Sequence, residues 1–199
     1  GDIADLHLAS AKGHQYLLKV SRDVKTNNLI SREVTALKQL VKIKNNAYFP
    51  GFTESFSIKG NKSVLAMPYD DGFYTLEQVM KKFPNGLEPR HFAWMFNRML
   101  ASLGYTHELG LVHGHITPAH FLVHAKHHGG RLIDWTGHVK TGEKLTSIST
   151  AYKTYYPPEV FAKEPATPAL DIYMAAKCGI ALLGNTQDVH PLIRGFLKV

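Results

Sequence analysis

The chain has 199 residues, of which 44% are hydrophobic and 20% are charged. It is therefore long enough for one domain or two small lobes, and it is neither a disordered nor a collagen-like chain. Its single cysteine, Cys178, cannot form an internal disulfide and favours a reducing, cytoplasmic setting. No apolar run reaches the ~18 residues that a membrane span needs. The net charge is +7, yet no basic run or alternating aromatic and basic pattern points to a nucleic-acid partner.

The first third of the chain is predicted to form a small sheet with one helix. An apolar run interrupted by Lys19 and two runs separated by a Lys-Gly-Asn turn are typical of strands. These strands are expected at 15–20, 52–58 and 63–67. A helix is expected over 28–43, because two asparagines suit its beginning and apolar residues then repeat at helical spacing.

The remainder is predicted to be mainly helical. Pro89 suits the first position of a helix, and apolar residues follow it at helical spacing as far as Gly110, a suitable C-cap. Short strands are expected at 121–123 and 131–133, around a turn rich in histidine and glycine. A helix over about 168–183 is apolar on nearly all sides, which predicts that it is buried.

The segment over 104–123 carries the clearest chemical signature. A His-Glu-x-Gly turn, His113, Pro118 and a Phe-Leu-Val strand follow one another in it. This segment resembles the catalytic-loop region of the protein kinase superfamily. Other family motifs follow in order: Lys19 lies in a predicted strand, Glu33 comes 14 residues later on a predicted helix, and Asp134 follows the loop as the aspartate of an Asp-Phe-Gly motif would.

The resemblance implies an α+β, bilobal protein-kinase-like fold. A small antiparallel-sheet N-lobe with one helix is expected over 1–67, a hinge over 68–72 and a mainly helical C-lobe over 73–199. Both lobes are expected to be incomplete in this chain. The glycine loop is reduced to residues 1–7, with Ala4 in place of its third glycine, and the C-lobe is truncated near its end, where 188–198 resembles a late helix of the lobe.

The resemblance also assigns a nucleotide site with ATP and Mg²⁺ as cofactors. Lys19 and Glu33 would hold a cation near the phosphates, while Met67 and Tyr69 would line an adenine pocket at the hinge. Asp134 would face Mg²⁺, together with His120, which replaces the family's asparagine. A surface lysine, a glutamate on a helix face and an aspartate in a turn remain plainer interpretations of three of these residues.

Four residues are expected to have structural roles. His113 and Trp135 would stack with Leu37 as part of the family's internal spine. Asp171, which opens the apolar helix, would accept backbone N–H groups of the catalytic loop. A Pro-Pro-Glu motif ending at Glu159 resembles the family's Ala-Pro-Glu, and the arginine that usually pairs with that glutamate would lie beyond residue 199.

The loop departs from the family at the positions on which phosphoryl transfer depends. His115 stands where an aspartate accepts the proton of the substrate hydroxyl, Thr117 replaces a lysine, and His120 replaces a metal ligand. Gly114 replaces the arginine that pairs with a phosphorylated activation loop. The expected function is therefore that of a nucleotide-binding pseudokinase, a scaffold or regulator whose partner is another protein or domain.

Two alternatives remain open. An active, atypical Ser/Thr-kinase-like phosphotransferase would use ATP, Mg²⁺ and His115 as its base, since neutral histidine accepts a proton. A transition-metal site is the other alternative, because histidines recur between 107 and 128 and imidazole is a good ligand for such metals. Histidines in a glycine-flanked turn are also found simply exposed to solvent.

Overall fold

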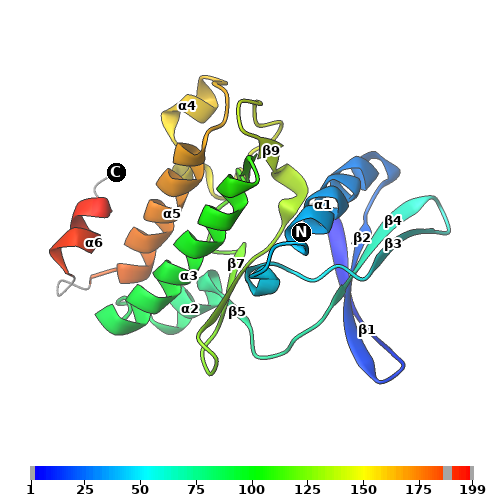
Figure 1. Ribbon diagram of the computed structural model, residues 1–199, viewed down its shortest axis with the longest axis horizontal. Helices are drawn as coiled ribbons and strands as arrows, with labels where there is room; N and C mark the ends of the chain where they lie inside the picture. The colour runs from blue at the N-terminus through cyan, green and yellow to red at the C-terminus, as the bar shows by residue number, and fades with distance from the viewer. Residues whose placement is uncertain (1–2, 186–189, 198–199) are drawn as a thin grey trace.

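An antiparallel sheet covered by one helix forms the N-terminal part of the protein. The structure, a computed structural model, describes residues 3–185 and 190–197. The strand order is β1–β2–β4–β3, and α1 (Asn27–Leu40) lies against the sheet (Figure 1). The strands are β1 (Ala4–Ala11), β2 (His14–Ser21), β3 (Glu54–Ile58) and β4 (Lys62–Pro68).

Helices dominate the second part, which the chain reaches through the segment after β4 (Figure 1). The helices are α2 (Leu76–Lys82), α3 (Pro89–Glu108), α4 (Pro158–Phe161), α5 (Pro168–Leu183) and α6 (Pro191–Phe196). The strands are β5 (Tyr74–Thr75), β6 (Leu111–Val112), β7 (Phe121–His124), β8 (Gly129–Leu132) and β9 (Val139–Lys140). The 3₁₀ turns are η1 (Val24–Thr26), η2 (Asn46–Tyr48), η3 (Trp135–Gly137) and η4 (Lys153–Tyr155). The predicted α+β class is confirmed. Among the described residues, no helix combines the length and the apolar character needed to cross a membrane.

The helices predicted to begin at Pro89 and near Pro168 are confirmed. Both α3 and α5 begin at the proline that suits the first turn, and Gly184 caps α5. The helix expected over 28–43 ends earlier, at Leu40, because the chain tightens into i→i−3 hydrogen bonds. The N–H groups of Lys42 and Ile43 each donate to a carbonyl three residues back, at 3.1 Å.

Strand β1 and helix α2 are among the elements that were not predicted from the sequence. The interpretation of residues 1–7 as a reduced glycine loop is wrong from Ala4 onward. Ala4 opens β1, which pairs with β2 along its whole length. Residues 1–2 lie outside the described part. Helix α2 begins with a capping box, in which Thr75 and Gln78 exchange hydrogen bonds between side chain and backbone. That Thr-x-x-Gln pattern in the sequence indicates the start of a helix. The late helix expected at 188–198 is α6, and its flanking residues 188–189 and 198 are not described.

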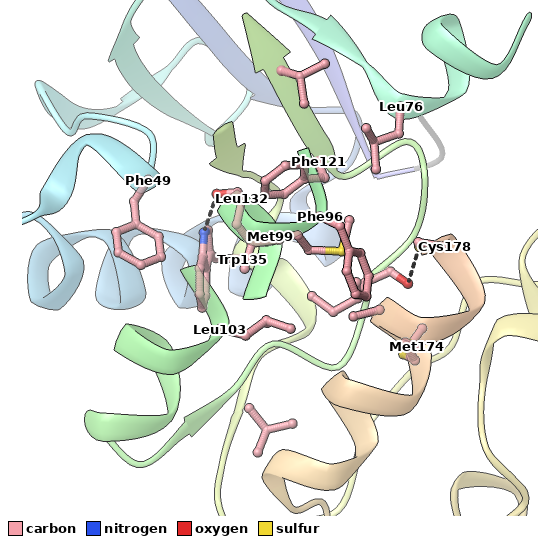
Figure 2. Close-up of a cluster of buried hydrophobic side chains, with 14 of the residues drawn as sticks. Phe49, Leu76, Phe96, Met99, Leu103, Phe121, Leu132, Trp135, Met174 and Cys178 are labelled. Atoms are coloured by element: carbon pink, nitrogen blue, oxygen red, sulfur yellow. Dashed lines mark hydrogen bonds between the residues drawn. The ribbon is translucent and has the colours of Figure 1, made fainter. Parts of the chain in front are cut away.

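The core of the second part lies between α3, α5 and the β7–β8 hairpin (Figure 2). Its large side chains are fully or nearly fully buried and come from distant segments: Leu76, Phe96, Met99, Leu103, Phe121, Leu132, Trp135, Met174 and Cys178. A buried side chain of this size contributes about 1.5–3 kcal/mol. Burial raises the pKa of the Cys178 thiol, and its Sγ points at the carbonyl of Ile116 at 3.8 Å. Cys178 is therefore a packing residue.

Candidate functional site

Three charged side chains from three separate segments meet between the sheet and the helical part. Lys19 of β2 donates from Nζ to Glu33 Oε2 of α1 at 2.6 Å and to Asp134 Oδ1 at 3.0 Å. Asp134 lies 115 residues from Lys19 in the sequence, immediately before η3. The interpretations of these residues as an isolated surface lysine, a helix-face glutamate and a simple turn aspartate are therefore wrong.

Burial sets the electrostatics of this cluster. The Lys19 side chain is 11% exposed and that of Glu33 only 2%. Burial by itself would lower the pKa of Lys19, but the Glu33 and Asp134 carboxylates outweigh it and raise that pKa. Burial also raises the pKa of Glu33, against the opposing effect of Lys19. Burial favours protonation of Asp134 too, but Lys19 and His120 hold the pKa of its carboxyl well below the usual range.

Asp134 is held by its backbone as well as by its charge. It has a left-handed conformation, with φ 64° and ψ 75°, which costs a residue with a side chain of order 1–3 kcal/mol. The surrounding contacts maintain it. Thr136 Oγ1 donates to Asp134 Oδ1 at 2.7 Å, and the N–H of Trp135 donates to Glu33 Oε1 at 3.2 Å. The turn that presents Asp134 is thus tied directly to α1.

Asp171 anchors the loop that contains the His-Gly-His triplet. This carboxylate is fully buried at the start of α5. Its Oδ2 accepts the N–H of His113 and its Oδ1 accepts that of Gly114, both at 2.8 Å. Oδ2 also contacts His107 Nε2 at 3.0 Å. Two backbone donors and one imidazole therefore meet a single carboxylate. The resemblance implies the backbone contacts, whereas the contact with His107 was not predicted.

His113 is a fully buried neutral ring. Its Nδ1 accepts the N–H of His115 at 3.2 Å, so Nε2 carries the proton and donates to the carbonyl of Ile133 at 3.0 Å. Burial lowers the pKa of His113 to about 3. The ring packs edge-on against Trp135, with 4.7 Å between the centroids. Leu37 is fully buried in the same core, as the proposed stacking requires.

His115, the candidate base, is engaged by the segment that follows η3. It is only 7% exposed. Its Nε2 faces the carbonyl of Ser147 at 3.1 Å and must donate to it. The ring also lies over Gly137, where an added Cβ would come within 2.7 Å of Nε2. Burial lowers the pKa of His115. The side chain thus links the loop to residue 147 and is poorly placed to receive a proton from a substrate.

The backbone conformation at position 114 explains why glycine stands there. The φ of Gly114 is +73°, and a Cβ there would lie 2.5 Å from Leu145 Cδ2. A side chain at this position would be strained by the positive φ and would require Leu145 to move.

Gly114→Ala is expected to lower the free energy of unfolding by about 1–3 kcal/mol, because it adds both a left-handed alanine and a steric clash. Urea denaturation followed by tryptophan fluorescence measures this. Gly104→Ala is the control: Gly104 lies within α3 with open space around it, so alanine there should stabilise the chain or leave it unchanged. Equal effects at the two glycines would contradict the explanation.

An apolar surface adjoins the charged cluster on the same face of the sheet. Leu6 pairs with Lys19, and Leu8 pairs with Leu17, which in turn pairs with Met67. Directly paired residues of antiparallel strands project to the same side, so all five side chains share the face on which Lys19 meets Asp134. Met67 is buried, whereas Leu6 and Leu8 are 59% and 57% exposed. Of these apolar residues, only Met67 was assigned to the site from the sequence. The in-register pairing of β1 with the strand that carries Lys19 is the signal that identifies the others.

The remaining assigned residues lie in different settings. Tyr69 follows β4, is partly exposed, and donates its N–H to the carbonyl of Gln15 at 3.0 Å. Thr117 is fully buried, and no partner for its hydroxyl is found among the described residues. Glu159 is exposed on α4 and forms no ion pair within the described part of the chain.

The residues assigned to Mg²⁺ do not fit that ion. Mg²⁺ requires near-octahedral oxygen coordination at about 2.0–2.1 Å. Asp134 supplies one carboxylate, and Lys19, Thr136 and His120 contact both of its oxygens. His120 offers nitrogen, to which Mg²⁺ binds poorly. Across residues 3–185 and 190–197, no three His, Cys, Asp or Glu side chains converge as a metal-holding group, which also weighs against the histidine-cluster alternative.

A cavity of about 510 Å³ lies elsewhere, between α1 and the segment 138–146. Arg32 projects from α1 into this region, where it donates to Thr146 Oγ1 at 2.9 Å and to the carbonyl of His138. The contacts fasten α1 to the segment that also engages His115. The charged cluster does not line this cavity. The candidate site is the charged cluster and not this cavity, because the cluster lies on the apolar face of the sheet.

No protein-family model and no curated protein matches this chain. The assignment of a function therefore depends on the geometry of the site.

Proposed function

We propose that the chain is a kinase-like domain with a bilobal arrangement, whose cleft binds a nucleotide such as ATP, and that it acts as a scaffold or regulator for another protein or domain. The observation that carries this proposal is the meeting of Lys19, Glu33 and Asp134 at distances of 2.6 and 3.0 Å. A buried lysine held by a helix carboxylate presents a fixed cation to phosphate groups.

The apolar surface supports the same proposal. A nucleotide needs a charged place for its phosphates and an apolar place for its base. The exposed side chains of Leu6 and Leu8 lie in line with Lys19 and Leu17. Exposed leucines that border a buried cation would gain most from covering an aromatic base.

A regulatory role is favoured over phosphoryl transfer by the contacts of His115. Positioning of the nucleophile is central to phosphoryl transfer. Here the ring that would do this is buried and donates to the carbonyl of Ser147. The lysine expected two residues later is Thr117, a neutral and fully buried side chain. In the described part of the chain, the groups expected to bind phosphates are thus present, whereas those expected to support transfer are replaced.

Calorimetric titration of ATP into the purified chain tests the proposal. We expect saturable binding to the wild type. We expect binding to be lost in Lys19→Ala, because the substitution removes the cation that faces the phosphates. Circular dichroism of each sample verifies that the variant is folded.

A second variant keeps the test decisive where Lys19→Ala unfolds. Leu8→Asp changes an exposed residue of β1 and should leave the fold intact, yet it places a carboxylate on the face that would cover the base. Weaker ATP binding is expected. A flat titration of the folded wild type, or unchanged binding in both variants, would overturn the proposal.

A further inference from the structure

Both oxygens of the Asp134 carboxylate are occupied by groups of the chain itself. Oδ1 accepts from Lys19 Nζ at 3.0 Å and from Thr136 Oγ1 at 2.7 Å. Oδ2 lies 3.3 Å from His120 Nε2. These three contacts use most of the about four acceptor positions of the carboxylate. A metal ion that bound Oδ1 would have to displace Lys19 or Thr136, and the Lys19 contact belongs to a buried ion pair.

His120 is fixed in place by the backbone. Its Nδ1 lies 2.9 Å from the carbonyl of His115, an atom that can only accept, so Nδ1 donates the hydrogen bond. This contact directs the opposite edge of the ring toward Asp134, where Nε2 donates to Oδ2 when the ring carries both protons. The histidine is thus held across the second oxygen of the carboxylate.

Among the residues that the structure describes, Glu33 is the other carboxylate in contact with this cluster, and both of its oxygens are engaged. Oε2 accepts from Lys19 and Oε1 accepts from the N–H of Trp135. The chain therefore offers one engaged carboxylate and one imidazole where Mg²⁺ requires several oxygens.

We infer that Asp134 binds no divalent metal ion, and that the cleft takes its nucleotide in the metal-free form, with His120 occupying the place of the ion. The second half rests on the proposed function; the first half stands on the contacts of Asp134 alone. Lys19 then remains the group of the chain that faces the phosphates, and magnesium is not needed to bring the nucleotide in.

Direct metal binding tests the first half without any nucleotide. Mn²⁺ is added to the wild type and the free ion is counted by electron paramagnetic resonance. We expect the wild type to bind no more Mn²⁺ than His14→Asn, a control that removes an exposed histidine from the hairpin end of β2. His120→Asn replaces nitrogen by an amide oxygen and frees Oδ2. It should bind Mn²⁺ about tenfold or more tightly than the wild type.

Nucleotide titrations in EDTA and in excess Mg²⁺ test the second half. We expect the same ATP affinity in both buffers for the wild type and for His14→Asn. For His120→Asn we expect affinity to become about tenfold or more stronger with Mg²⁺.

The outcomes separate the two proposals. Tight Mn²⁺ binding by the wild type that Asp134→Asn abolishes would overturn the inference, whatever the nucleotide does. A wild type that binds ATP only with Mg²⁺ would overturn it as well. Failure to bind ATP in either buffer would instead end the proposed function, while the Mn²⁺ measurement would still decide whether Asp134 holds a metal.

Discussion

Replacing Asp171 with alanine is expected to destabilise the folded chain by about 3–5 kcal/mol. The buried carboxylate accepts the N–H groups of His113 and Gly114, each at 2.8 Å. Alanine would leave both donors buried without an acceptor, at a cost of about 1–3 kcal/mol for each group. Since domains are stable by only about 5–15 kcal/mol, this single change removes a large share of the total.

Urea denaturation followed by the fluorescence of Trp135 measures the loss, because that ring is fully buried against His113. Asp171→Asn should fall between the wild type and alanine, since its oxygen satisfies one donor while its NH₂ group faces the other. Asp5→Ala is the control. It breaks a half-exposed ion pair with Arg22 and should change stability little. An Asp171→Ala protein as stable as Asp5→Ala would contradict the anchoring role.

The helices that carry their own signals could be predicted from the sequence. In α3 and α5 a first-turn proline, apolar spacing and a terminal glycine all agree, so local preference decides the structure. Strand β1 carries only a short signal: Ala4, Leu6 and Leu8 alternate with Asp5 and His7. The resemblance assigned this stretch to a loop, and Leu6 and Leu8 stay exposed in the strand that forms. It forms because β2 offers a free edge.

The members of the candidate site were predictable, but their geometry was not. The order of motifs named Lys19, Glu33 and Asp134, since each motif is a short pattern. The contact of His115 with Ser147 spans 32 residues, and the packing of Leu145 on Gly114 joins two loops. Contacts of this kind depend on where the segment after η3 folds, which no periodicity records.

The same contacts connect several residues of the loop with one another. Gly114 leaves room for Leu145, and Gly137 leaves room for the ring of His115. His120 then uses the carbonyl of His115 to reach Asp134. Gly114, His115 and His120 thus take part in one packed arrangement. That arrangement closes the loop against the following segment.

Replacing Lys19 with methionine is expected to cost about 3–5 kcal/mol, because it leaves the buried Glu33 without its cation. The double variant Lys19→Met/Glu33→Gln removes the buried charge together with its partner. It should recover at least half of the lost stability and still fail to bind ATP. Urea denaturation of the wild type, Lys19→Met, Glu33→Gln and the double variant gives the coupling energy between the two side chains.

The pH dependence gives an independent readout of the same pair. Burial raises the pKa of Glu33, and Lys19 opposes that rise, so Lys19→Met should raise it further. A carboxyl whose pKa is higher when folded than when unfolded binds more protons in the folded state, so stability falls as pH rises. The stability of Lys19→Met should therefore decline as pH increases above the ordinary pKa of glutamate, about 4.3. The double variant should lack this decline. A single variant as stable as the wild type at neutral pH, with no such slope, would show that Lys19 does not neutralise Glu33 in the folded chain.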